Sequence, residues 1–464
     1  MAITILAIGL LVFVGHFLAG FFERTKVPDV LILMLAGIVL GPVLGVVESR
    51  DFGRVGDVFA TLALIIILFE GGIHLNLRHL AAAAADTLTV SLATMAVTVL
   101  SLAYLGELLL SIDFPTALLV ATVLGGTSSA VVVPLLRALK LSATPSTVLF
   151  LESSLTDVLV IVLTLGLIQG MRTGLGAAEM DGAGLALAVV GSFVWAGLIG
   201  AAGAFVWSAL LDKVRQVPNT VFTTIAYVFI LFGIAELSGY SGAIAALAFG
   251  IAVANFPNIP ERFLGKVFSF RLAAFADHER AFFAEAVFLV KTFFFVFLGV
   301  SISFADPRAV VAGVLLAIVV FLVRTVIIRL VGPQSASRRD AALMTALVPK
   351  GLAAAVLASL PLQAGLPRAE TIQATVYAVV FFTIVFSAAL VIAVERGWLD
   401  PVMTFWYAKY PLQVAPSDAQ VRTSRQIIQQ SLVVADLAGL QEPNPIVDLG
   451  APQADETLAE ESES

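Results

Sequence analysis

Two carboxylates lie close together in an otherwise apolar stretch, residues 151–158. Glu152 and Asp157 are five residues apart, so on a helix their side chains point about 140° apart and cannot easily form one carboxylate pair. Ser153 and Asp157 are four residues apart and therefore share a helix face. The spacing predicts one carboxylate paired with an arginine and the other left free with a serine beside it.

Few other charges interrupt the apolar stretches, and each needs a partner or a purpose because an ionisable group inside a membrane costs about 2.5–3.5 kcal/mol. Besides Glu152 and Asp157, they are Glu70, Lys291, Arg324 and Lys350. Arg324 is the best candidate partner for Glu152. We interpret that pair as structural, holding the centre of the protein together.

Asp157 is then the free carboxylate. An unpaired carboxyl group in a membrane can take up a proton, and with hydroxyl and carbonyl oxygens nearby it also suits a small hard cation. Competition between a proton and a cation for one carboxylate is enough to couple their movements. The alternative, a hydrogen bond that only packs helices, stays open for Asp157.

The sequence leaves the roles of the other charges open. Glu70 could complete an oxygen cage for the cation or face a cytoplasmic cavity. Lys350 lies between Pro349 and Gly351, where it could offset the negative ends of broken helices. Lys291 is interpreted as a charge that reaches a helix end or acts as a gate. No cysteine is present and the four histidines lack metal-ligand spacing, so we expect no cofactor.

The composition places these residues in a membrane protein. Of 464 residues, 59% are hydrophobic and 13% are charged, and the mean hydropathy is +1.02. A soluble domain is about a quarter charged, so a soluble enzyme is close to excluded. Nucleic acid is not an expected partner; membrane lipid is.

The net charge of −7 belongs to the C-terminal end. Residues 411–464 carry nine acidic and two basic side chains, which accounts for the whole imbalance. We expect a membrane domain at 1–410 and an acidic, largely disordered tail at 411–464.

Apolar runs predict an all-α protein with about thirteen membrane crossings. They are about 3–22, 28–47, 55–77, 83–105, 112–139, 144–171, 182–211, 217–237, 240–256, 281–303, 306–331, 338–364 and 370–398. The first is interpreted as a crossing and not as a signal peptide, because it lacks a basic start and a clear cleavage site. The segment 259–280 mixes aromatic and basic residues and is predicted to be an interfacial helix, with a plain loop as the alternative.

Basic residues in the loops predict the orientation. One set of alternate loops holds thirteen Lys and Arg residues and the other holds five. Cytoplasmic loops carry the excess, so we expect the N-terminus outside and the tail in the cytoplasm, in a cell inner (plasma) membrane.

Six crossings, one linking crossing and six more would make two inverted repeats, a plan common in secondary transporters. The fifth segment of each half carries helix-breaking residues: 125–129 (GGTSS) in one and 349–351 (PKG) in the other. Breaks at corresponding positions of two halves point to an ion site. The alternative is that Gly and Pro are simply frequent in membrane helices.

At these residues the chain resembles the monovalent cation:proton antiporters of the sodium/proton exchanger type, the NhaP-like branch of the CPA superfamily. The matching pieces occur in the expected order: LFEGGIHL (68–75), GGTSSAVVVPLL (125–136), ESSLTDVLVIV (152–162), KTFFFVFLGVSI (291–302), FLVRTVIIRL (321–330) and LVPKGLAAAVLA (347–358).

The resemblance implies the NhaA/NhaP-like fold and a homodimer. Each protomer would combine a dimerisation scaffold with an ion-carrying core, about 83–171 and 306–398, that moves as an elevator. It also implies that Asp157 alternates between proton and cation and that Glu152 and Arg324 form the buried ion pair. Positions that match Glu70, Thr127 and Ser153 contribute to the ion site in such antiporters.

Three positions depart from the family pattern. Thr156 replaces the usual Asn before the aspartate and is kept as a candidate ion-binding residue. Ser128 stands where an aspartate usually follows the threonine, and Lys350 replaces an arginine. Ser128 and Lys350 are the candidates for balancing charge at the broken helices.

The predicted function is exchange of Na⁺ or Li⁺ for H⁺. A single titrating carboxylate favours electroneutral exchange, an inference that Thr156 weakens. A K⁺/H⁺ antiporter is the runner-up, and a cation channel is a more distant alternative.

Overall fold

The computed structural model describes most of the membrane domain. The described residues are 9, 13, 15, 17, 28–47, 53–74, 85–139, 141–172, 182–216, 221–256, 275–302 and 307–412. The predicted first crossing, the predicted interfacial helix at 259–280 and the acidic tail lie wholly or mostly outside these residues.

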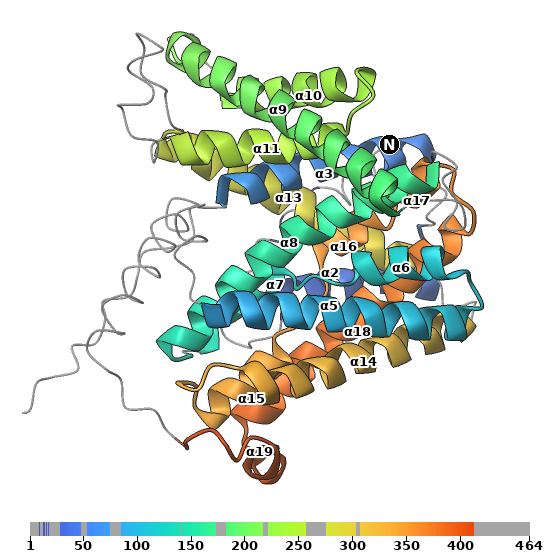
Figure 1. Cartoon of the computed structure of the whole chain (residues 1–464), viewed down its shortest axis with the longest axis vertical. Coiled ribbons are helices and arrows are strands. Elements are labelled where there is room, and N and C mark those ends of the chain that lie inside the picture. Colours follow the sequence, from blue (N-terminus) through green and yellow to red (C-terminus); the bar gives the residue numbers. More distant parts are fainter. Residues whose placement is uncertain are drawn as a thin grey trace, which may run out of the picture.

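Every regular element in the described residues is a helix (Figure 1). The longer elements before residue 260 are α2 (Asp29–Ile38), α3 (Gly53–His74), α5 (Ala85–Leu110), α6 (Phe114–Val123), α7 (Ser129–Leu139), α8 (Ala143–Arg172), α9 (Gly182–Val214), α10 (Val221–Leu237) and α11 (Gly242–Asn255). Those after it are α13 (Asp277–Ser301), α14 (Pro307–Val331), α15 (Arg338–Ala346), α16 (Leu352–Leu357), α17 (Leu360–Gln363), α18 (Ala369–Glu395) and α19 (Asp400–Trp406).

The helices are those of a multi-pass membrane protein. Within the described part of the chain, six helices are long and apolar enough to cross a bilayer: α5, α8, α9, α13, α14 and α18. Several shorter apolar helices pack among them. The total of thirteen crossings and the inverted repeat stay predictions.

One of the predicted segments is more irregular than expected. The segment predicted at 28–47 is α-helical to Ile38 and then continues as one π-helical turn, Val39–Val43, which contains Pro42. Proline has no N–H to donate to the helix and crowds the preceding turn, so the regular helix ends just before it.

Two close helix crossings, each at a pair of glycines, join the helices outside the predicted core. Gly37 of α2 lies against Gly299 of α13, where an added Cβ at Gly37 would be 2.2 Å from the carbonyl oxygen of Val296. Gly72 of α3 meets Gly250 of α11 in the same way. Only glycine lets the backbones approach this closely.

The predicted core is built from α5, α8, α14 and α18 around the two broken helices. The first broken helix stops at Val123 and restarts at Ser129 as α7. The second stops at Ala346 and restarts at Leu352 as α16. Both interruptions therefore fall at the Gly- and Pro-containing runs that the sequence singles out.

Candidate ion site at the crossing of two broken helices

The two interruptions lie against each other and are joined by hydrogen bonds. The backbone N–H of Ser128 donates to the carbonyl oxygen of Pro349 over 2.9 Å. The ammonium group of Lys350 reaches back and donates to the carbonyl oxygen of Gly126 over 2.8 Å. The backbone N–H of Lys350 donates to Thr383 Oγ1 of α18. Backbone groups that the breaks leave without helical partners are thus satisfied inside the protein, as a membrane requires.

Lys350 is almost fully buried, with 1% of its surface exposed. Its ammonium group lies at the carbonyl end of α6, where the helix dipole places partial negative charge. That Lys350 offsets the negative ends of the broken helices stays a prediction. Ser128 packs against the same crossing, because an added Cβ at Gly351 would lie 1.9 Å from Ser128 Oγ.

Asp157, in the middle of α8, contacts the start of the restarted helix. Its Oδ2 accepts a hydrogen bond of 2.6 Å from Ser129 Oγ and a longer one of 3.4 Å from the Ser129 backbone N–H. Ser129 is the first residue of α7, so the carboxylate lies at the positive end of that helix dipole. The side chain is half-buried.

The predicted neighbours of Asp157 make other hydrogen bonds. Ser153 Oγ donates to the carbonyl oxygen of Phe150 in its own helix. Thr156 Oγ1 accepts from the backbone N–H of Thr127 over 3.0 Å and so ties α8 to the first break. The serine hydroxyl that donates to Asp157 therefore comes from Ser129. A helix restart directly after Gly125–Ser128 was the signal that could have identified Ser129.

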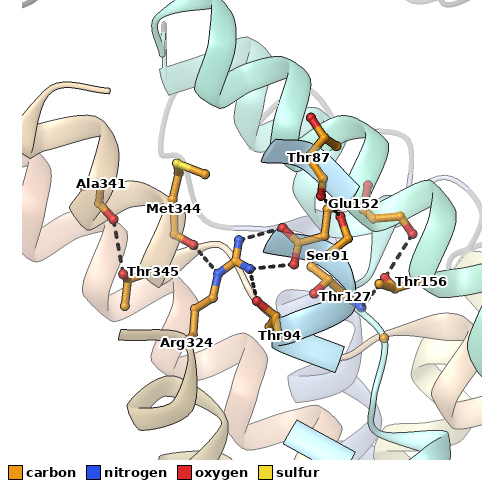
Figure 2. Close-up of polar contacts among 12 residues, drawn as sticks. Thr87, Ser91, Thr94, Thr127, Glu152, Thr156, Arg324, Ala341, Met344 and Thr345 are labelled. Carbon is orange, nitrogen blue, oxygen red and sulfur yellow. Dashed lines mark hydrogen bonds and ion pairs between the residues drawn. The ribbon is translucent and has the colours of Figure 1, made fainter. Parts of the chain in front are cut away.

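The ion pair between Glu152 and Arg324 lies at the centre of the core (Figure 2). Arg324 Nη1 and Nη2 donate to the two carboxylate oxygens of Glu152 over 2.6 and 2.7 Å. The guanidinium also donates to Thr94 Oγ1 and to the carbonyl oxygen of Met344, each over 2.9 Å. Both charged side chains are fully buried, so the pair pins α5, α8, α14 and α15 together.

Glu70 approaches the site from outside the predicted core. It lies on α3 and is half-buried, and α3 packs against α16. Lys291 is engaged elsewhere: its ammonium group pairs with Asp29 of α2 over 2.9 Å, instead of extending to a helix end.

A membrane-embedded helical bundle with two interrupted helices that cross beside a buried lysine and a carboxylate defines a class, the secondary membrane transporters. The sequence places the chain within that class. Residues 9–395 match the family described as "Sodium/hydrogen exchanger, transmembrane". The chain belongs to the sodium/hydrogen exchanger family.

Two characterised relatives are similar in sequence. The Na(+)/H(+) antiporter 1 of Methanocaldococcus jannaschii is 23% identical over 159 residues, which cover 34% of this chain and 37% of that protein. The chain thus matches about a third of that relative's length. The ammonium/H(+) antiporter subunit AmhT of Alkalihalophilus pseudofirmus is 24% identical over 323 residues, 68% of this chain and 75% of that protein.

A solved structure shows the same fold. The sodium proton antiporter MjNhaP1 from Methanocaldococcus jannaschii superposes with a TM-score of 0.62 at 19% sequence identity, covering 84% of this chain and 99% of that one. A second structure of MjNhaP1, obtained by electron microscopy, gives a TM-score of 0.59 at 18% identity and covers 90% of this chain and all of that one.

Proposed function

We propose that the protein is a secondary active antiporter that exchanges Na⁺ or Li⁺ for H⁺. The observation that carries the proposal is the carboxylate of Asp157, hydrogen-bonded to Ser129 at the point where the two broken helices cross. One carboxylate can hold a proton or a cation, and binding of either removes its negative charge. Exclusive binding of the two substrates at one group couples their opposite movements.

The hydroxyl of Ser129 suits both states of this carboxylate. It donates to the charged Asp157 in the absence of a cation, and by rotating it can turn an oxygen lone pair toward a bound ion. We propose Ser153, Thr127, Thr156 and Glu70 as the other candidate oxygen ligands. Hard oxygen ligands are those that small alkali cations prefer.

Electroneutral exchange is supported by the ion pair. Arg324 neutralises Glu152 through two charge-assisted hydrogen bonds, which leaves Asp157 as the proposed titrating group. A cycle that carries either one proton or one monovalent cation on Asp157 moves no net charge.

The proposed mechanism is alternating access by an elevator movement of the core, 83–171 and 306–398, against the remaining scaffold. Two inverted repeats are part of this proposal, and the glycine crossings support them. In thirteen crossings, α2 and α11 would be the second helices of the halves, and α3 and α13 the third. Each crossing therefore joins the second helix of one half to the third helix of the other. The two-fold axis of an inverted repeat would map the α2–α13 crossing onto the α3–α11 crossing.

The excess of basic residues in one set of loops supports a cytoplasmic location for those loops and for the C-terminus, in an inner (plasma) membrane with the N-terminus outside. We also propose that two copies form a homodimer through the scaffold.

The test is Asp157→Asn in proteoliposomes. The change keeps the size of the side chain but removes the charge, so we expect a folded protein without cation-dependent proton flux. Asp113→Asn is the matched control. Asp113 caps the start of α6, at the opposite end of that helix from the break, and asparagine caps helices equally well. Substantial exchange by Asp157→Asn would overturn the assignment.

Exchange of a larger monovalent cation is the second candidate. AmhT, whose sequence match covers 68% of this chain, is an ammonium/H(+) antiporter subunit. K⁺ is close to ammonium in size. Proton flux measured with Na⁺, Li⁺, K⁺ and NH₄⁺ in turn, with and without a clamped membrane potential, separates these substrates. The same measurement distinguishes electroneutral exchange from a channel, whose flux follows the potential.

A further inference from the structure

The chain continues beyond its last long helix into a short helix at the edge of the core. After α18 the backbone turns at Gly397, whose φ is +71°, and α19 follows at Asp400–Trp406. Figure 1 shows α19 beside α14 and α15 and nearly end-on, whereas the long helices run across the view. A helix oriented across the membrane-spanning helices lies roughly in the plane of the bilayer.

The inner face of this segment is fixed to the core. Tyr407 OH and Thr345 Oγ1 of α15 are hydrogen-bonded over 2.5 Å. Tyr410 OH donates to the carbonyl oxygen of Ile328 of α14 over 2.5 Å. Arg338 Nε donates to the carbonyl oxygen of Tyr410 over 3.0 Å. The segment is therefore a rigid part of the core.

The outer face is apolar and exposed. The side chains of Trp398, Val402, Phe405 and Leu412 are 64%, 60%, 79% and 74% exposed. These four large hydrophobic residues lie within fifteen positions of one another, whereas Met403 of the same helix is buried. One buried and one exposed apolar face is the pattern of a helix that lies between protein and lipid.

Cations lie over one aromatic ring of this apolar face and over two more deeply buried rings of the same segment. Arg396 lies 5.2 Å from the ring centroid of Trp398, and Lys409 lies 4.7 Å from that of Tyr410. Arg329 lies over the ring of Trp406. The acidic groups nearby are Asp400, in the first turn of α19, and Glu395, which pairs with Arg339. Basic and aromatic side chains together are typical of the headgroup region.

We propose that α19 and its flanking residues, 396–412, bind the anionic phospholipid headgroups of the leaflet at the end of α18, the cytoplasmic one in the proposed orientation. The apolar face inserts among the upper acyl chains, and Arg396 and Lys409 contact the phosphates. A second copy of the chain fits less well, because a symmetric contact would place these cations opposite each other. The lipid is therefore bound by the core itself.

Tryptophan quenching by brominated lipids tests the contact without depending on transport. The chain has four tryptophans, so one variant retains only Trp398 and a matched one retains only Trp406, with phenylalanine at the other three positions. In proteoliposomes, we expect phosphatidylglycerol brominated near the headgroup to quench Trp398 at least twofold more than the same fraction of brominated phosphatidylcholine. Trp406, half-buried against Arg329, should be quenched less.

Charge removal separates headgroup binding from simple insertion. In the variant that retains only Trp398, Arg396→Gln with Lys409→Gln should lower quenching by brominated phosphatidylglycerol to the phosphatidylcholine level. Arg368→Gln, the same change at the opposite end of α18, should keep the preference. Equal quenching by both lipids before charge removal, or no quenching of Trp398 at all, would overturn the proposal. Neither result bears on cation exchange, which is measured separately.

Discussion

The hydrogen bond between Ser129 and Asp157 joins a continuous helix to the first residue of a restarted one. The carboxylate of Asp157 therefore faces a hydroxyl group and the N–H groups at the start of α7, all of which stabilise negative charge. Any movement of α7 against α8 would change this contact directly. The proposed ion-binding residue and the position of the broken helix are thus coupled through one side chain.

Ser129→Ala should weaken cation binding more than Ser154→Ala does. A hydrogen bond to a charged group contributes about 1.5–3 kcal/mol, and its loss destabilises the carboxylate form that the cation must bind. We expect the apparent KM for the cation to rise about tenfold in Ser129→Ala. Ser154→Ala is the matched control, because that hydroxyl belongs to the same helix, donates to the carbonyl oxygen of Phe150 and is not among the proposed ion ligands. Equal KM values for the two variants would contradict the geometry.

Removing one member of the ion pair at the centre of the core should lower the stability of the protein more than replacing both members by apolar residues. Glu152→Ala or Arg324→Ala leaves one fully buried charge without its partner, which costs about 3–5 kcal/mol of stability. Thermal unfolding in detergent should show a large drop in Tm for either variant. Glu152→Leu combined with Arg324→Met removes both charges and should recover most of that loss. A double variant that melts no higher than the single ones would contradict this account.

Individual residues show what a sequence can and cannot specify. Glu152, Asp157, Arg324 and Lys350 were identifiable because charge in an apolar stretch needs a reason. Ser129 was overlooked, although it belongs to the predicted break at 125–129, because its contact with Asp157 depends on how α7 packs against α8. Asp29 was missed for another reason: next to Pro28 it looks like an ordinary helix start, although it pairs with Lys291 across 262 positions of the chain.

At the scale of elements, the two broken helices depend on each other. The carbonyl group of Gly126, in the first break, accepts from Lys350 of the other break, and the carbonyl group of Pro349 accepts from Ser128. The Gly- and Pro-containing runs predicted both interruptions. The sequence could not predict which atoms meet, because the crossing brings together positions more than 200 residues apart.

Gly351→Ala should disrupt this crossing, and Ser128→Gly should partly restore it. The added Cβ would lie 1.9 Å from Ser128 Oγ and 2.4 Å from Ser128 Cβ, too close for either atom to stay in place. We expect Gly351→Ala to lose exchange activity and several degrees of Tm. Adding Ser128→Gly removes both clashing atoms, whereas adding Ser128→Ala leaves the Cβ and should not help. Equal rescue by both second changes would show that the clash is not the cause.

At the scale of the whole molecule, the predicted core and scaffold differ in how they are held together. The core is pinned by a buried ion pair and by hydrogen bonds between its helices. The scaffold helices are joined by close glycine crossings. Between them lies a cavity of about 590 Å³, lined by residues of both parts, including Thr61 of α3, Gln169 of α8 and Gln363 of α17. The proposed elevator movement would take place along this boundary.

A cross-link across this boundary should stop transport if the core moves against the scaffold. Thr61 Oγ1 lies 3.5 Å from Gln363 Oε1, and the chain contains no cysteine, so Thr61→Cys with Gln363→Cys introduces the only two thiols. Joining them with a short bifunctional thiol reagent that a reductant can cleave should abolish cation-dependent proton flux, and cleavage should restore it.

The control is Ser359→Cys with Gln363→Cys, which shares one position but links neighbouring residues within the predicted core. That cross-link should leave flux unchanged, because both residues move together. Undiminished flux in the cross-linked Thr61 and Gln363 pair would exclude movement at this boundary while leaving the assignment of Asp157 intact.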